Sequence, residues 1–293
     1  MTSALERLEI GEFVITRLLD GIFLVDGGAM FGVVPRTLWE KRAAPDRENR
    51  ITLALNCYLI RGRGSTILVD TGVGPDVDRR HIDFYSFRRE PGLLGGLEVA
   101  GVRPDQVDVV FNSHLHFDHC GGNTVRAGDK EWRPAFPKAV YAVQRGEWEQ
   151  ARNPVGRDRP SYIPARLKAL DRGVSLNLLD GDTPIRDGVE AVLIPGHTAF
   201  HQGLKVTSGG RTFFYFGDTV PTSAHIDLPY ITSYDLFPVE TFNNKKSLYE
   251  RAVAEDWIVG FSHDLRHAFG SIRKAGRRYE FVPLRHGPAT KKG

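Results

Sequence analysis

The segment Ser113-His114-Leu115-His116-Phe117-Asp118-His119 places three histidines and an aspartate within six residues. It follows the apolar run at residues 107–111, which predicts a buried strand, and it leads into Gly121-Gly122. Such a turn can aim several side chains inward. Neutral imidazole and carboxylate are ligands that borderline metals such as zinc accept. This segment therefore predicts a metal site, since a cluster of such density has few other uses.

Further metal ligands are expected where later strands are predicted to end. The candidates are His197 in Pro195-Gly196-His197-Thr198, Asp218 in Phe216-Gly217-Asp218, and His263 in Phe261-Ser262-His263-Asp264. Three are fewer than two complete coordination spheres require, so one ligand should be shared. A carboxylate has two oxygens, which makes Asp218 the natural bridge. We therefore expect one position formed by His114, His116 and His197 and a second formed by Asp118, His119 and His263.

The remaining pattern predicts two sheets with helices outside them. Strands are expected at 13–18, 53–60, 66–69, 107–111, 139–143, 189–194, 203–206, 212–216 and 257–261, and helices at 93–99, around Trp148 and at 247–256. Residues 153–164 are rich in proline and arginine and predict a surface excursion. With no repeat and no low-complexity linker, the pattern favours one domain over residues 1–293, with a loose tail at 287–293.

Composition excludes several classes of protein. The chain has 293 residues, 41% of them hydrophobic and 26% charged, which is typical of a globular protein. The net charge of +3 is too small to indicate nucleic-acid binding. Neither a transmembrane stretch nor a secretion signal is apparent, so we expect a cytoplasmic location and no membrane partner. The two cysteines, Cys57 and Cys120, do not form a disulfide framework, and Cys120 is expected to be a packed thiol.

The ligand pattern resembles that of the metallo-β-lactamase superfamily. The motif His-x-His-x-Asp-His, followed by distant His, Asp and His, matches at seven of seven positions, and Leu68-Val69-Asp70-Thr71-Gly72 is similar to the family's strand-end element. The resemblance implies an α/β (α+β) fold, an αββα sandwich of two mixed sheets flanked by helices. It also implies two divalent metal ions, with zinc expected, and an Asp70 that orients a ligand histidine. His201 is expected to support the site rather than to ligate.

Within the family, Asp218 and His116 narrow the chemistry to hydrolysis. The antibiotic-hydrolysing members that use a cysteine as ligand lack a bridging carboxylate, and flavodiiron relatives carry glutamate where this chain has His116. The resemblance implies attack by a metal-bridging hydroxide, with Asp118 as the catalytic residue that carries the proton to the leaving oxygen. Residues 26–35 and 217–222 look like those of the quorum-quenching lactonases that open N-acyl-homoserine lactones.

A small-molecule lactone or ester is thus the expected substrate. Met30 and Phe31 are candidates for an apolar slot, with weaker candidates at Phe84, Phe87 and Tyr230. The related lactonases place a tyrosine three residues after the bridging aspartate, where this chain has Pro221; His225 or Tyr230 is an alternative source of that group. Hydrolysis of organophosphates or of other carboxylic esters remains the alternative activity. Residues 28–35 are also expected to be exposed, and a homodimer interface is the alternative use of that segment.

Overall fold

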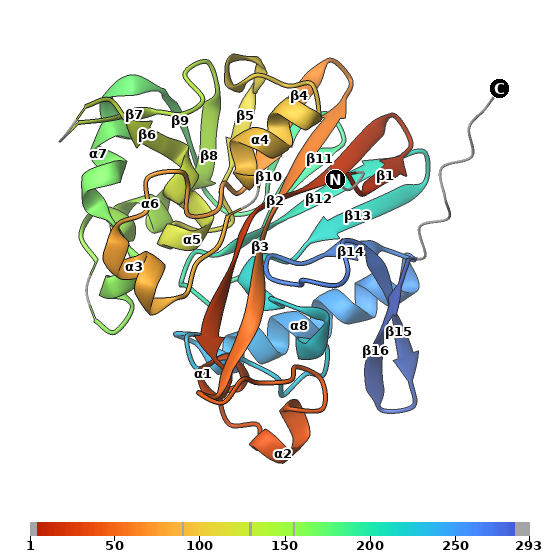
Figure 1. Ribbon diagram of the computed structural model, residues 1–293. Helices are drawn as coiled ribbons and strands as arrows, with labels where there is room; N and C mark the ends of the chain where they lie inside the picture. Colours follow the sequence, from red (N-terminus) through yellow and green to blue (C-terminus); the bar gives the residue numbers. More distant parts are fainter. Residues whose placement is uncertain (1–4, 90, 129–130, 155, 285–293) are drawn as a thin grey trace.

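Two mixed β-sheets face each other, and helices cover the outer surfaces of the pair (Figure 1). The computed structural model describes residues 5–89, 91–128, 131–154 and 156–284, so the tail predicted at 287–293 lies outside the described residues. The αββα arrangement expected from the family resemblance is confirmed. In the part of the chain described, no helix combines the length and apolar composition needed to cross a bilayer.

The first sheet is antiparallel on its N-terminal side and parallel from β4 onward. Its strands in spatial order are β1 (Arg7–Ile10), β2 (Phe13–Asp26), β3 (Arg50–Gly62), β4 (Ser65–Val69), β5 (Val109–Phe111), β8 (Val140–Gln144) and β9 (Ser175–Leu179). Arg63 and Gly64 both have positive φ, 47° and 71°, and form a two-residue turn between β3 and β4. A turn with left-handed residues at both central positions matches the twist of its strands, so β3 and β4 form a hairpin here.

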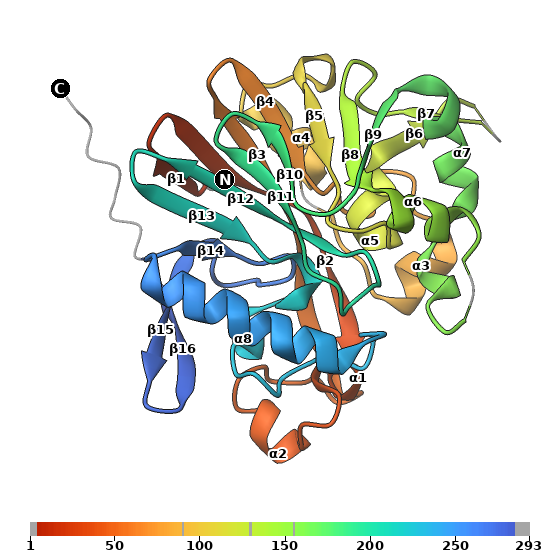
Figure 2. The same ribbon diagram turned by 180° about the vertical axis from the view of Figure 1, so that it is seen from behind.

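The second sheet is antiparallel except for one pair, β13 and β14. Its strands are β10 (Thr183–Arg186), β11 (Val189–Leu193), β12 (Gln202–Ser208), β13 (Arg211–Tyr215), β14 (Ile258–Gly260), β15 (Gly270–Ala275) and β16 (Arg278–Pro283). A small separate sheet pairs β6 (Thr124–Arg126) with β7 (Trp132–Pro134). The parallel pair needs a long crossover, which α8 (Pro238–Ala254) supplies on the outer side of the sheet (Figure 2).

The other helices are short and lie mainly beside the first sheet (Figure 1). They are α1 (Gly27–Phe31), α2 (Arg36–Trp39), α3 (Arg79–Phe84), α4 (Gly92–Val99), α5 (Phe117–Cys120), α6 (Arg145–Arg152) and α7 (Pro164–Gly173). Single 3-10 turns occur at Pro104–Gln106, Gly121–Asn123, Arg159–Ser161, Gly217–Thr219 and Ser223–His225.

The core has an inner layer between the sheets and an outer layer on each side. Along β13, Phe213 and Tyr215 face the inner layer, whereas Phe214 and Phe216 pack outward under α8. This alternation is the two-residue period of a strand whose two faces are both covered. Across the first sheet, Leu97 of α4 and Leu167 of α7 belong to the opposite outer layer.

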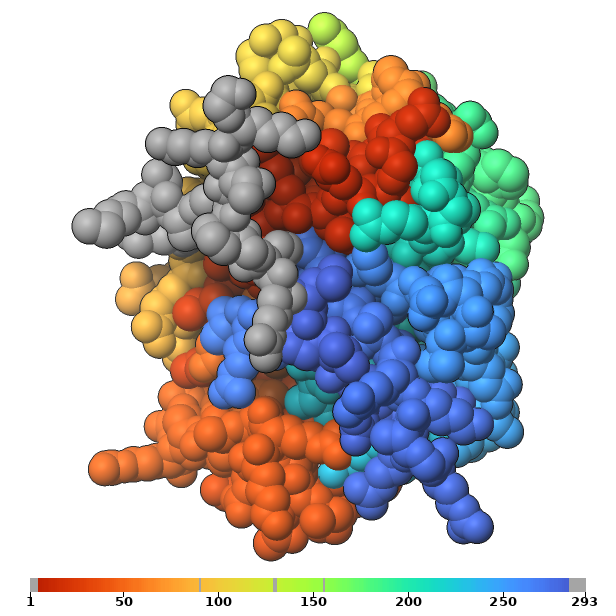
Figure 3. Space-filling model, turned by 90° about the vertical axis from the view of Figure 1, so that its right-hand side faces the viewer, coloured from red at the N-terminus to blue at the C-terminus, as the bar shows by residue number. Residues whose placement is uncertain are grey.

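The N-terminal hairpin closes one edge of the sandwich. Figure 3 shows the first strands, in red, beside the turn between β12 and β13. The backbone N–H of Glu12 donates to Ser208 Oγ at 3.1 Å, and Arg211 donates to the carbonyl of Glu9 at 2.7 Å. These contacts join the two sheets through segments about 200 residues apart in the sequence.

Two segments differ from the prediction. The helix predicted at 247–256 begins nine residues earlier, at Pro238, because proline is well tolerated in the first turn, where no N–H partner exists. The predicted surface excursion at 153–164 is partly buried. Asp158 and Tyr162 are only 8% and 4% exposed, and both hydrogen-bond to α6 residues. The segment therefore lies at the surface, where Arg157 and Arg159 are exposed, but it also inserts the side chains of Asp158 and Tyr162 into the interior.

Candidate metal centre

The histidine cluster sits on the turn that leaves β5 and enters α5. His114 and His116 precede the helix, and Asp118 and His119 lie within it. Gly121 and Gly122 end this turn against the backbone of residues 71–73. A Cβ at Gly121 would lie 2.3 Å from the Val73 carbonyl oxygen, and one at Gly122 would lie 2.2 Å from that of Thr71. Only glycine allows this approach, which fixes the cluster beside the end of β4.

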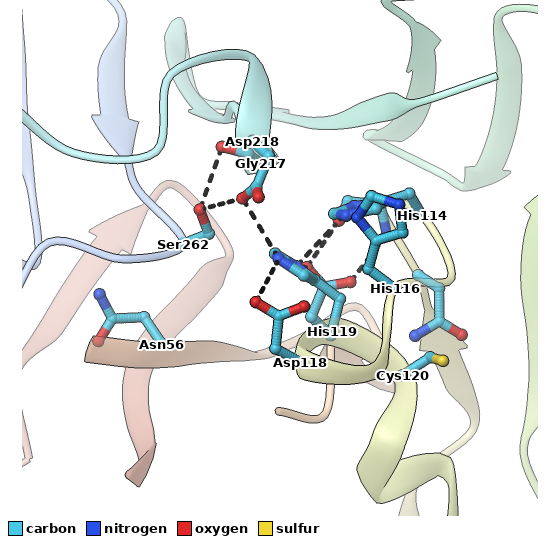
Figure 4. A network of polar contacts seen from close by, with 12 residues as sticks. Asn56, His114, His116, Asp118, His119, Cys120, Gly217, Asp218 and Ser262 are labelled. Carbon is cyan, nitrogen blue, oxygen red and sulfur yellow. Dashed lines mark hydrogen bonds and ion pairs between the residues drawn. The ribbon is translucent and has the colours of Figure 1, made fainter. Parts of the chain in front are cut away.

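The three distant candidates come to the same place. His197 lies between β11 and β12, Asp218 follows β13, and His263 follows β14. Donor atoms of neighbouring residues fall within 4.8 Å of one another in three groups: His114, His116 and His197; His114, His119 and Asp218; and Asp118, His119 and His263. All seven side chains singled out from the sequence thus meet in one cluster. Figure 4 labels His114, His116, Asp118, His119 and Asp218 of this cluster.

Asp218 lies between the two halves of this cluster. Its Oδ1 is 3.3 Å from His119 Nε2 and 3.2 Å from His263 Nε2, whereas its Oδ2 is 3.5 Å from His197 Nε2. Ser262 Oγ donates to Oδ1 at 2.7 Å and restrains the carboxylate (Figure 4). The two oxygens therefore face different histidine groups, as a carboxylate shared by two cations requires.

The donor set fits divalent cations. Nε2 of His114, of His116 and of His119 are buried and have no hydrogen-bond partner among the described residues. A buried nitrogen without a partner is costly, and a metal ion would satisfy it. Burial and the neighbouring histidines hold the pKa of His114 and of His116 well below the usual value, so both imidazoles are neutral, the form that ligates.

Asp70 orients the cluster from the inner layer. Its Oδ2 lies 2.9 Å from His119 Nδ1 and accepts hydrogen bonds from Ser113 Oγ at 2.8 Å and from the Tyr215 hydroxyl at 2.7 Å. Its Oδ1 accepts from the Ser113 N–H. Asp70 itself has φ 52°, a left-handed conformation that aspartate tolerates better than most residues. This geometry leaves Nε2 of His119 as the nitrogen that faces the cluster.

The histidines from the second sheet have their own partners. His197 Nδ1 lies 3.0 Å from Asp235 Oδ1, and His263 Nδ1 lies 2.8 Å from the carbonyl oxygen of Ala54. His201 takes a different place. The backbone N–H of Asp218 donates to His201 Nε2 at 3.0 Å, so this ring positions the bridging residue and its Nε2 is occupied. This contact is consistent with the supporting role expected for His201, which stays a prediction.

A comparison with known protein families shows which family this chain belongs to. The family described as the metallo-beta-lactamase superfamily matches residues 51–268, which is more than half of the chain and contains all seven clustered side chains. The chain belongs to this superfamily. The expectation of a metal-dependent hydrolase with this fold is therefore confirmed at that level.

Known proteins are similar to this chain over most of its length. An N-acyl homoserine lactonase from Bacillus cereus is 26% identical over 239 residues, covering 76% of this chain and 86% of that protein. The crystal structure of a probable metal-dependent hydrolase from Staphylococcus aureus superposes with a TM-score of 0.86 at 25% identity, covering 96% and 100% of the two chains. AidC, a dizinc quorum-quenching lactonase solved with its product, gives a TM-score of 0.81 at 20% identity, covering 97% and 99%.

A cavity of about 300 Å³ opens above the metallo-beta-lactamase centre of this chain. Asp118, His116, His197, Asp218 and His263 form its floor. The rest of the lining combines apolar and aromatic residues, namely Phe23, Val25, Met30, Leu53, Tyr85 and Phe117, with a more polar set, namely Arg157, Asp158, Pro160, Ser161, Thr232 and Tyr234. The segment at 153–164 thus contributes to the site, which its polar composition did not indicate.

Of the residues expected from the sequence to contact the substrate, some line the cavity and others do not. Met30 lines this cavity. Phe31 is fully buried behind it, stacked on His225 at 4.4 Å between ring centroids. His225 is enclosed as well, because its Nδ1 contacts Thr222 Oγ1 and its Nε2 contacts the Met30 carbonyl.

Three further candidates lie outside the lining. Tyr230 is covered by Arg42, whose guanidinium lies 4.2 Å from the ring centroid. Phe84 is 74% exposed, and Phe87 packs beside the apolar cluster without reaching the cavity. The expectation that residues 28–35 form an exposed apolar segment is wrong, because α1 turns Met30 and Phe31 inward and Val33, at 93% exposure, is the one large side chain of that stretch that is fully outward.

A second cavity of about 570 Å³ lies behind the first, on the face seen in Figure 3 between the orange segment after α2 and the blue β15–β16 hairpin. Leu53 and His263 line both cavities and therefore stand between them. Asp264 is well anchored here, since it accepts from the N–H groups of Ser223, Arg266 and His267. These bonds hold the loop that carries His263.

Proposed function

We propose that this member of the metallo-beta-lactamase superfamily is a dizinc lactonase that opens N-acyl-homoserine lactones. The observation that carries the proposal is Asp218, whose two oxygens face two separate histidine groups at the floor of a largely apolar cavity. The lactonases among its relatives, from Bacillus cereus and AidC, support the choice of substrate.

The proposed ligands form two sets that share one carboxylate. His114, His116 and His197 would hold one cation, Asp118, His119 and His263 would hold the other, and Asp218 would be shared. When bound, two divalent cations lower the pKa of an attacking water and polarise the scissile carbonyl. The described residues then have to bind the substrate, orient it and move one proton.

Asp118 is the proposed proton carrier. It is the carboxylate of the cluster with the larger exposure, 15% against 12% for Asp218, and it lines the cavity floor. Its Oδ2 lies 3.7 Å from His263 Nε2. Ring opening leaves an alkoxide that needs a proton, and Asp118 can deliver it from the side on which the substrate lies.

Two tyrosines replace the candidates proposed from the sequence for polarising the carbonyl. Tyr85 and Tyr234 both line the cavity, whereas His225 and Tyr230 do not reach it. Burial raises the pKa of Tyr85 to about 12, and the Asp118 carboxylate adds to this rise. A phenol with such a pKa remains a hydrogen-bond donor at neutral pH. Met30, Phe23 and Leu53 are proposed to contact the acyl chain.

A panel of substrates tests the proposal. Purified protein should contain about two zinc ions per chain and open N-acyl-homoserine lactones, with acyl length affecting kcat/KM. His114→Ala, which removes a ligand, is the control for activity that does not depend on the centre. Metal-loaded protein that is inert toward every lactone would contradict the assignment.

Hydrolysis of phosphotriesters or other carboxylic esters is the second candidate. Pro221 and the aromatic lining, Phe23, Phe117, Tyr85 and Tyr234, favour it, because flat rings suit an aryl leaving group. Aryl phosphotriesters and aryl esters in the same panel separate the two activities by the ratio of their kcat/KM values.

A further inference from the structure

Glu147, on α6, is a fully buried carboxylate that lies behind the metal centre. Its Oε1 accepts a hydrogen bond from the Leu115 N–H at 2.9 Å and one from the Tyr162 hydroxyl at 3.1 Å. Its Oε2 accepts from Thr198 Oγ1 at 2.7 Å. All three donors are themselves buried, so this carboxylate is satisfied entirely by protein groups.

The two donors nearest the centre lie beside ligands of one cation position. Leu115 is between His114 and His116, and Thr198 directly follows His197. These are the three histidines that form one group of the cluster. Glu147 thus joins two loops, one after β5 and one after β11, that come from different sheets and must meet within hydrogen-bonding distance: His116 Nδ1 lies 3.2 Å from His197 Nε2.

The third donor connects this carboxylate to the cavity. Tyr162 follows the wall residues Pro160 and Ser161, and its ring meets His116 edge-on with 4.9 Å between centroids. The second cation position has separate supports, since Asp70 holds His119 and the Ala54 carbonyl holds His263. Glu147 contacts neither of those histidines in any hydrogen bond described.

A carboxylate suits this place for a chemical reason. It has two acceptor oxygens and no donor, whereas an amide would direct an NH2 group at one of three donors. Burial raises the pKa of Glu147, and the three hydrogen bonds act in the opposite direction. A buried carboxylate is costly unless it is fully hydrogen-bonded, and the loss of one contact therefore disturbs the remaining two.

We propose that Glu147 is a positioning residue that aligns the three-histidine cation position and ties it to the cavity wall. It touches neither substrate nor cation. The inference rests on the proposed metal centre but not on the identity of the substrate.

The test uses two variants that each keep only one complete cation position, and Glu147 is then replaced in both. In a His263→Ala background the three-histidine position remains complete, and in a His197→Ala background the other position does. Adding Glu147→Gln should weaken the first background's affinity for Co²⁺ about tenfold or more, the loss typical when a group that orients ligands is removed. In the His197→Ala background, Glu147→Gln should change the affinity for Co²⁺ by less than about threefold. Affinities are measured by competition with a chelator and by the visible spectrum of the bound Co²⁺.

Three further variants complete the design. Glu149→Gln, an exposed glutamate on the same helix, should leave both affinities unchanged. Thr198→Val should reproduce the selective loss without altering the carboxylate. Tyr162→Phe should leave Co²⁺ affinity within about threefold and raise KM, because it loosens the wall.

An equal loss in both backgrounds, accompanied by a matching fall in the Tm of metal-free protein, would overturn the inference and assign Glu147 a purely structural role. The absence of any loss would overturn it too. Wild-type protein that binds two cations and opens no lactone would contradict the proposed substrate while leaving these affinity measurements decisive.

Discussion

Asp235 Oδ1 lies 3.0 Å from Nδ1 of His197, and both side chains are buried. Two threonines fix this carboxylate, Thr232 donating to Oδ1 at 2.8 Å and Thr241 donating to Oδ2 at 2.6 Å. Burial lowers the pKa of His197, but Asp235, helped by Asp218, outweighs it and raises that pKa. The pair fixes the ring so that Nε2 faces the cluster.

Asp235→Asn should therefore weaken metal binding about tenfold, because a neutral amide makes His197 a less basic ligand. Chelator competition measures the change, and the Thr232→Val variant should show a smaller loss of the same kind. An unchanged affinity in Asp235→Asn would show that the carboxylate does not tune this ligand.

Asp118→Asn should lower kcat for lactone opening by about 100-fold or more, the usual range for losing a general acid or base. Asparagine keeps the shape and one oxygen but is a weaker ligand than the carboxylate, so the variants are compared at a metal concentration that fills both positions. Asp83→Asn, an exposed aspartate of α3, is the matched control. Steady-state kinetics with metal analysis of the same samples would check this, and full activity in Asp118→Asn would refute the proton-carrying role.

Much of the metal centre could be predicted because its ligands are encoded locally. His114, His116, Asp118 and His119 lie within six residues, and each distant ligand lies three or four residues after the end of a strand, where a side chain can reach an edge shared by both sheets. A cluster of three histidines and an aspartate within six residues has few roles other than metal binding. The αββα arrangement followed from the resemblance that this pattern carries.

The orienting residues were harder to predict, since their role exists only in three dimensions. Asp235 and Glu147 lie 38 and 32 residues from the partners that they hold, within segments that show no motif. Arg157 and Ser161 belong to a polar stretch typical of a surface loop, yet they line the cavity. The interpretation of Phe84 as a substrate contact relied on its being apolar, and α3 leaves that side chain outside.

Met30 gives a prediction about acyl length. It is 5% exposed and lines the cavity, so Met30→Trp should fill part of the space available to a long chain. Each methylene that loses its contact costs about 0.8 kcal/mol, roughly a fourfold factor in kcat/KM. Long-chain lactones should therefore be disfavoured relative to short ones. Val33→Trp, at an exposed position three residues on, should not alter the ratio between long-chain and short-chain kcat/KM values.

Tyr85→Phe and Tyr234→Phe should identify the group that polarises the carbonyl. Loss of one donor to a developing oxyanion typically costs about 100-fold in kcat, so one variant should fall by roughly that amount and the other by much less. Because the pKa of Tyr85 is raised to about 12, its phenol stays protonated and activity should not decline from this cause below about pH 10. Equal activity in both variants and in the double variant would refute the assignment.

His225 predicts how stability depends on acid. Burial lowers its pKa to about 4, and the Lys245 ammonium adds to this effect, although the contact with the Met30 carbonyl opposes it. In the unfolded chain the pKa of histidine is about 6.5, so below that pH the unfolded state binds a proton that the folded state rejects. The free energy of unfolding should consequently fall as pH decreases from 6.5 toward 4, by about 2 kcal/mol at pH 5 from this residue. In His225→Gln that share of the slope should disappear, which denaturant titrations of metal-free protein at pH 7.5 and pH 5 can measure. Parallel slopes in the variant and the wild type would show that His225 is accessible to protons in the folded state.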